Sequence, residues 1–143
     1  MTPRDTQRMI RQLAAVEGYL ELSLPQAALE ILERLEIHGP LAAVALLFKG
    51  EALQALGRLD EAIEALQRAV ELFPGPYKQR ALWSLSRCYA QLGATSQAEQ
   101  ALAALKQIGA AQGGGVHVVL MPIFQIEHVP GRSRRTSEDK AGR

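Results

Sequence analysis

The stretch GRLDEAIEALQRAVELFP, residues 57–74, indicates how the chain is organised. Its apolar residues recur every three or four positions, which predicts an amphipathic helix over about 59–73. Gly57 can supply the left-handed conformation that closes a preceding helix, and Pro74 ends the following one. Asp60 falls near the predicted N-terminus, where an acidic side chain favours the helix dipole. The stretch therefore predicts one helix with a defined start and a defined end.

Parts of this pattern occur again on both sides of the stretch. Ala62 and Pro74 have counterparts 34 residues earlier, at Ala28 and Pro40, and Ala62 has another 36 residues later, at Ala98, where no closing Pro follows. The matching sets are Ser23, Gly57 and Gly93 at a turn, then Ala28, Ala62 and Ala98, then Leu32, Leu66 and Leu102. Joint recurrence of a turn residue, a small residue and a large apolar residue indicates a repeated helical hairpin.

Six helices in three hairpins fit the apolar spacing and the Gly and Pro breaks. The predicted helices cover about 5–22 and 25–37, 41–56 and 59–73, and 77–92 and 96–108. These predict a three-repeat domain over 1–112, with repeats at about 5–40, 41–76 and 77–110. Residues 113–143 then form a Gly-rich linker, an apolar extended segment and a basic C-terminus of disordered composition.

The repeat resembles the tetratricopeptide repeat, in which a large residue, Leu-Gly and Tyr are followed by Ala, a large apolar residue and Pro. In the second repeat the corresponding residues are Leu46, Lys49, Gly50, Leu53, Ala62, Leu66 and Pro74. The first and third repeats match fewer of these positions. The resemblance implies an all-α fold, a right-handed superhelix or solenoid of three helix-turn-helix hairpins, with an irregular or extended tail.

The resemblance also implies a function as a protein–protein interaction adaptor or scaffold. In this family the first helix of each hairpin lines a concave wall that holds a peptide or helix of a partner protein. Transferring the inward positions predicts a peptide-binding groove formed by Leu13, Glu17, Leu47, Phe48, Glu51, Arg80, Trp83 and Arg87. The alternative for Leu13, Leu47 and Trp83 is a purely structural role in the core.

Charges on this wall suggest what a ligand would carry. Glu17 and Glu51 are expected to pair with a basic ligand residue, and Arg80 or Arg87 with an acidic one. Family members that grip the C-terminal carboxylate of chaperones use Lys, Asn and Arg on this wall. The comparable places here hold Leu13, Glu17 and Phe48, which disfavours a chaperone-tail ligand.

Composition argues against several other function classes. The 16 basic and 15 acidic residues leave a net charge of +1, so no overall field favours nucleic acid or an anionic membrane as partner. The single cysteine, Cys88, excludes an internal disulfide and is expected to be a buried thiol. No apolar run resembles a secretory signal or reaches the roughly 20 residues of a membrane span, which predicts a cytoplasmic protein.

No residue pattern predicts catalysis. The three histidines, His38, His117 and His128, do not have the spacing of helical metal ligands. No glycine-rich phosphate loop or activated serine is present either. We therefore predict no enzyme activity, no cofactor and no metal.

The segment after Gly113–Gly115 leaves three hypotheses open. It is apolar and rich in β-branched residues, whereas the repeats end without a polar capping helix, so that Leu102 and Leu105 are expected to face water unless something covers them. Residues 118–126 are therefore expected to cover the last hairpin or to fold back into the groove as a built-in pseudo-ligand. A second hypothesis is strand pairing with another subunit, which would make the protein a homo-oligomeric structural module. The third is a tail that belongs to no ordered site.

Overall fold

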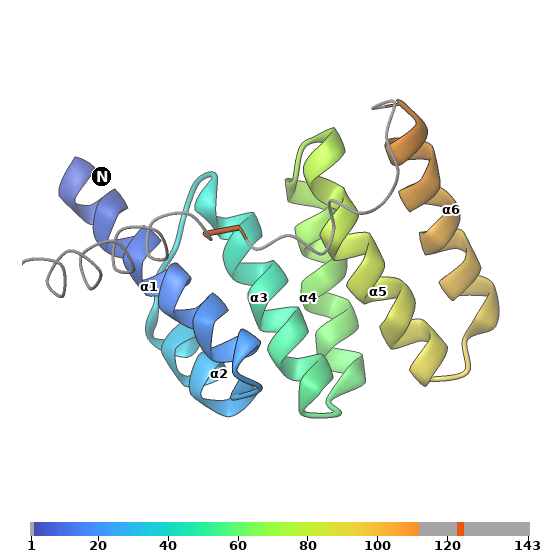
Figure 1. The fold of residues 1–143 in the computed structure, drawn as a ribbon, viewed down its shortest axis with the longest axis horizontal. Helices are drawn as coiled ribbons and strands as arrows, with labels where there is room; N and C mark the ends of the chain where they lie inside the picture. Colours follow the sequence, from blue (N-terminus) through green and yellow to red (C-terminus); the bar gives the residue numbers. More distant parts are fainter. Residues whose placement is uncertain (1, 112–122, 125–143) are drawn as a thin grey trace, which may run out of the picture.

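A computed structural model describes residues 2–111 and 123–124, and in this part of the chain six α-helices form three successive hairpins (Figure 1). The hairpins are α1 (Pro3–Glu21) with α2 (Pro25–Arg34), α3 (Leu41–Ala55) with α4 (Leu59–Leu72), and α5 (Gln79–Gln91) with α6 (Thr95–Ala111). A short 3-10 helix, η1 (Gly75–Lys78), leads into α5. The described residues contain no strand. The predicted all-α solenoid of three hairpins is confirmed.

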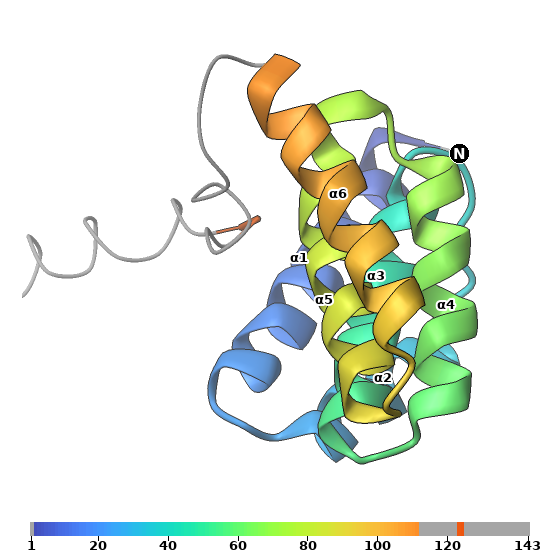
Figure 2. The same cartoon turned by 90° about the vertical axis from the view of Figure 1, so that its right-hand side faces the viewer.

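Both helices of one hairpin pack against the first helix of the next hairpin. Helix α3 packs against both α1 and α5, while α2 and α4 each also contact the first helix of the next hairpin. Figures 1 and 2 show α1, α3 and α5 side by side, with α4 on the opposite side of the stack. The first helices therefore form one continuous wall.

The recurring small residues lie where two helices of a hairpin approach closely. Ala28 and Ala62 are completely buried and Ala98 nearly so. In the second hairpin Gly50 of α3 faces Leu66 of α4, and an added Cβ would lie 2.6 Å from Leu66 Cδ2 and closer still to its Cγ. A side chain at residue 50 would push the two helices apart, which explains the Gly at this place in the motif.

The three equivalent turns have the same backbone conformation. Ser23, Gly57 and Gly93 all have positive φ, at 61°, 80° and 79°. The residue after each turn donates its N–H to the carbonyl five positions earlier, from Leu24 to Tyr19, Arg58 to Leu53 and Ala94 to Tyr89, at 2.8–2.9 Å. This is the 6→1 hydrogen bond of a Schellman motif. Ser23 therefore adopts a conformation that the other two repeats assign to glycine.

Four predicted helix boundaries were wrong by two or three residues; one of them is the end of α6, which lies at Ala111 and not at about 108. Helix α1 begins at Pro3 because Thr2 and Asp5 form a capping box, in which each side chain accepts the other's backbone N–H. Helix α2 ends at Arg34, since the extended segment beyond it buries Leu35 and Ile37 against the core without helical structure. Helix α5 begins at Gln79 because residues 75–78 form the 3-10 turn.

The end of the solenoid also differs from the prediction. Leu105 of α6 is buried against Leu82 of α5, and Leu102 packs at the edge of the same small cluster. These leucines were expected to face water until the tail covered them. The third hairpin instead closes its own core, because the apolar face of α6 turns toward α5.

Candidate functional site: a groove on the wall of first helices

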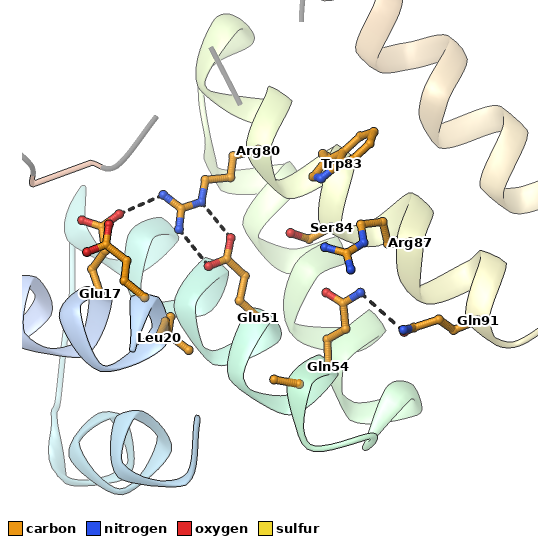
Figure 3. A pocket seen from close by; sticks show the side chains of 11 residues that line it. Glu17, Leu20, Glu51, Gln54, Arg80, Trp83, Ser84, Arg87 and Gln91 are labelled. Atoms are coloured by element: carbon orange, nitrogen blue, oxygen red, sulfur yellow. Dashed lines mark hydrogen bonds and ion pairs between the residues drawn. The ribbon is translucent and has the colours of Figure 1, made fainter. Parts of the chain in front are cut away.

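An open cavity of about 460 Å³ lies along the wall of first helices (Figure 3). Every residue that lines it belongs to α1, α3 or α5, so all three repeats contribute to one site. The lining residues are Glu17, Leu20, Glu21, Glu51, Gln54, Ala55, Arg80, Trp83, Ser84, Arg87 and Gln91. Three carboxylates and two guanidiniums thus face a cavity that also has apolar walls.

Arg80 connects the three repeats at one end of the cavity. Its Nε and Nη2 donate to the two oxygens of Glu51 at 2.7 and 2.9 Å, and its Nη1 donates to Glu17 Oε2 at 2.9 Å (Figure 3). Burial opposes the charge on Arg80, but the hydrogen bonds and attraction from Glu51 and Glu17 outweigh it and raise the pKa of Arg80. The guanidinium therefore stays charged and holds α1, α3 and α5 in one arrangement.

This network changes the expected role of the charges. Glu17, Glu51 and Arg80 were each predicted to await an oppositely charged ligand residue, but they pair with one another. Glu17 and Glu51 are 34 residues apart and hold the same position in their repeats, whereas Arg87 holds that position in the third repeat. Arg87 is exposed and makes no ion pair among the residues that the structure describes.

Phe48 forms the apolar centre beside this network. Its ring is completely buried, and the Arg80 guanidinium lies 5.5 Å from the ring centroid, within the range of a cation–π contact. Phe124 packs against the same ring edge-on, with centroids 6.3 Å apart and planes at 65°. The Phe48 ring thus contacts both a cation and a second aromatic ring.

The segment 123–124 is bound to this part of the wall through its backbone. The N–H groups of Ile123 and Phe124 donate to the two oxygens of Glu17, each at 2.8 Å. Figure 1 shows the segment near α1 and α3, and Figure 2 shows it on the side of the stack away from α4. These two residues therefore lie at the Glu17 end of the groove. Of the two versions of the covering hypothesis, this position fits the fold back into the groove and not the covering of the last hairpin.

The structure removes two residues from the predicted groove. Leu13 and Leu47 are 0% and 1% exposed, belong to the main core cluster and do not line the cavity. Phe48 is buried in the same cluster, but its ring contacts Phe124. Trp83 has both of the roles considered for it, since it lines the cavity and also packs on the Leu82–Leu105 cluster. The structure brings the remaining predicted residues together around the cavity or at its edge.

Ile123 and Phe124 were not predicted individually as site residues. Phe124 is the only aromatic residue after residue 112, which could have singled it out within the tail. The other predictions for the tail concern 112–122 and 125–143, including His117, His128 and the strand pairing, and they lie outside the described residues.

Several other predicted features can be placed in the fold. Cys88 is a buried thiol, and burial raises its pKa to about 11 against a smaller lowering effect of Arg87. Within 2–111 and 123–124, no group of three or more His, Cys, Asp or Glu residues is arranged to hold a metal ion. None of the helices described is both long and apolar enough to cross a membrane.

Comparison with known protein families agrees with the geometry. Two family models described as tetratricopeptide repeats match the chain, one over residues 13–76 and the other over 55–112. Neither describes a catalytic domain. Searches of the curated proteins and of the solved structures returned no match. The two matches together cover all three hairpins from residue 13 onward, and the chain therefore belongs to the tetratricopeptide repeat family.

Proposed function

We propose that this protein is an adaptor that binds a segment of a partner polypeptide in the groove between α1, α3 and α5. Proteins built from these repeats generally mediate protein–protein interactions. The observation that carries the proposal is the cavity itself, whose lining comes entirely from the first helices. Its volume of about 460 Å³ falls in the usual range for ligand sites, about 300–1,000 Å³.

The polarity of the groove supports an extended or turned peptide as ligand. Gln54 Nε2 donates to Gln91 Oε1 at 3.4 Å in its lining, and the Gln54 carbonyl oxygen and the Gln91 amide N–H groups can accept from and donate to main-chain groups. Arg87 supplies a cation without an internal ion pair in the described structure, so an acidic ligand residue is favoured there. A partner's terminal carboxylate is disfavoured beside Glu17, which already carries the negative charge at its end of the groove.

A site-specific crosslinking experiment tests this function. A photo-crosslinking amino acid placed at Gln91 should form a crosslink to a partner polypeptide in the native cell, because that position lines the groove. The same group at Glu64, exposed on α4, serves as the control and should not. Equal crosslinking from both positions would contradict a groove-specific interaction. Crosslinks only to a second copy of this chain would favour the homo-oligomeric alternative.

A matched pair of arginine variants gives an independent test. Arg87→Ala should reduce crosslinking of the partner, whereas Arg68→Ala, which removes another exposed arginine, from α4, should leave it unchanged. Neither change removes a buried contact, so helix content measured by circular dichroism should stay the same. An unchanged crosslink in Arg87→Ala would show that the cation does not contribute to binding.

A further inference from the structure

The contact between residues 123–124 and the wall identifies what one end of the groove recognises. Glu17 is only 3% exposed, and it accepts three hydrogen bonds, two of which come from consecutive backbone N–H groups. Two successive N–H groups that point at one anion form a nest, a backbone conformation suited to binding a carboxylate. Glu17 thus binds the main chain of a turn, which any two residues other than proline can present.

The subsite distinguishes ligands by the side chain of the second residue of this turn. Ile123 is 40% exposed, so little of the wall contacts its side chain. Phe124 in contrast packs edge-on against Phe48, whose ring also contacts the Arg80 guanidinium. An aromatic ring at the second position gains a contact that an aliphatic side chain would not reproduce. The subsite therefore favours an aromatic residue that directly follows the first bonded N–H.

We infer that Glu17, Phe48 and Arg80 form a subsite for a two-residue turn with an aromatic second residue, and that Ile123–Phe124 fills it as a competitor of the partner. This inference rests on the proposed function and specifies the ligand chemistry of the same groove. A partner segment that presents a non-proline residue followed by Phe, Tyr or Trp must displace the chain's own pair before it binds.

The short distance along the chain between α6 and Ile123–Phe124 determines how strongly this pair should lower the affinity of an added peptide. Residues 112–122 separate α6 from Ile123, so the pair is tethered by eleven residues and is present at an effective concentration on the order of millimolar. An external ligand meets a subsite that is vacant in only a fraction of molecules, so its apparent association constant is the intrinsic one multiplied by that fraction. Removing the competing aromatic ring should therefore increase the affinity of an added peptide about tenfold or more.

Fluorescence anisotropy with a labelled peptide tests the inference. The peptide VLMPIFQIEH, residues 119–128 with blocked ends, is titrated into the full chain and into its Phe124→Ala variant. We expect the variant to bind the peptide at least about tenfold more tightly than the unchanged chain. Ile123→Ala in the full chain is the matched control and should retain the weak binding of the unchanged chain, because that side chain is largely exposed.

Two further arms test the chemistry of the subsite. A peptide with Ala in place of Phe should not bind the Phe124→Ala chain measurably. The double variant Glu17→Gln, Phe124→Ala should bind the original peptide about tenfold more weakly than Phe124→Ala alone, because the charge-assisted hydrogen bonds are lost. Circular dichroism melting identifies any loss of folding in the Glu17 variant, and the single tail substitutions leave all six helices intact.

The outcomes separate this inference from the proposed function. Equal peptide affinity for the full chain and for Phe124→Ala, or no binding to either, would overturn the inference while leaving crosslinking from Gln91 unaffected. Peptide binding as expected, together with no partner crosslinked at Gln91, would overturn the proposed function and leave a site that serves the chain's own tail.

Discussion

Replacing Arg80 by methionine should destabilise the solenoid strongly, because this residue joins α1, α3 and α5. Arg80→Met retains much of the apolar stem but removes three hydrogen bonds, at 2.7, 2.9 and 2.9 Å, and the contact with Phe48. The Glu17 side chain is 4% exposed and would lose its cationic partner. Breaking a buried ion pair in this way costs about 3–5 kcal/mol.

The lower end of that range is the better estimate for this site. The side chains of Arg80 and Glu51 are 19% and 18% exposed, so water can partly solvate Glu51 after the substitution. A loss of about 3 kcal/mol corresponds to a decrease in Tm of roughly 12 °C for a domain of about 100 residues. Thermal melting followed by circular dichroism measures this directly. Arg68→Met, on the exposed face of α4, is the control and should change stability by less than about 0.5 kcal/mol.

A compensating variant tests the physical reason. The destabilisation in Arg80→Met comes mainly from carboxylates left without a cationic partner. Adding Glu17→Gln and Glu51→Gln removes these charges as well and should therefore restore at least half of the decrease in Tm. Melting of Arg80→Met within about 2 °C of Arg68→Met would refute the role of the network. A triple variant no more stable than Arg80→Met would show that shape or packing, and not charge burial, explains the loss.

Three further predictions concern the helical framework. Gly50→Ala should lower the free energy of unfolding by about 1–3 kcal/mol in chemical denaturation, because of its clash with α4, whereas Gly18→Ala, with no atom within 4 Å, should raise it by up to about 1 kcal/mol. Ser23→Gly should raise Tm and Gly57→Ala should lower it, each by an amount equivalent to roughly 1 kcal/mol, since both residues have positive φ. A Tm change of the same sign in both variants would contradict this. Burial raises the pKa of the Cys88 thiol to about 11 from a reference of 9.0, so the thiol of the unfolded chain ionises first and the stability relative to Cys88→Ala should fall as pH rises from about 9 to 11. At neutral pH the folded chain should resist a thiol reagent that labels the denatured chain quickly.

Much of the fold could be predicted because the repeat records local geometry. A small residue at 28, 62 and 98 reflects the close approach of paired helices, and the turn residues at 23, 57 and 93 share a left-handed backbone. Both constraints act within one hairpin and therefore recur along the sequence at the repeat spacing. Boundaries such as the end of α2 at Arg34 depended on tertiary packing of the following extended segment, which has no periodic signal.

The candidate site could be predicted only in part. Repeat position identified the inward-facing Glu17, Glu51 and Arg80, but it could not show that these charges neutralise one another, because the pairing joins residues 29 and 63 positions apart. The same limit explains why Leu13 and Leu47 were assigned to the groove. Along one helix, inward-facing positions look alike, and only the neighbouring helices determine which are covered.

By itself the sequence determined the family, the number of hairpins and the helices that form the wall. Those properties follow from short-range patterns of side-chain size and backbone conformation that each repeat carries separately. Only the tertiary structure decided that Arg80 links three repeats and that Ile123–Phe124 lies on Glu17, 106 and 107 residues away. Contacts between distant residues depend on how the hairpins stack, and no local pattern in the chain specifies that arrangement.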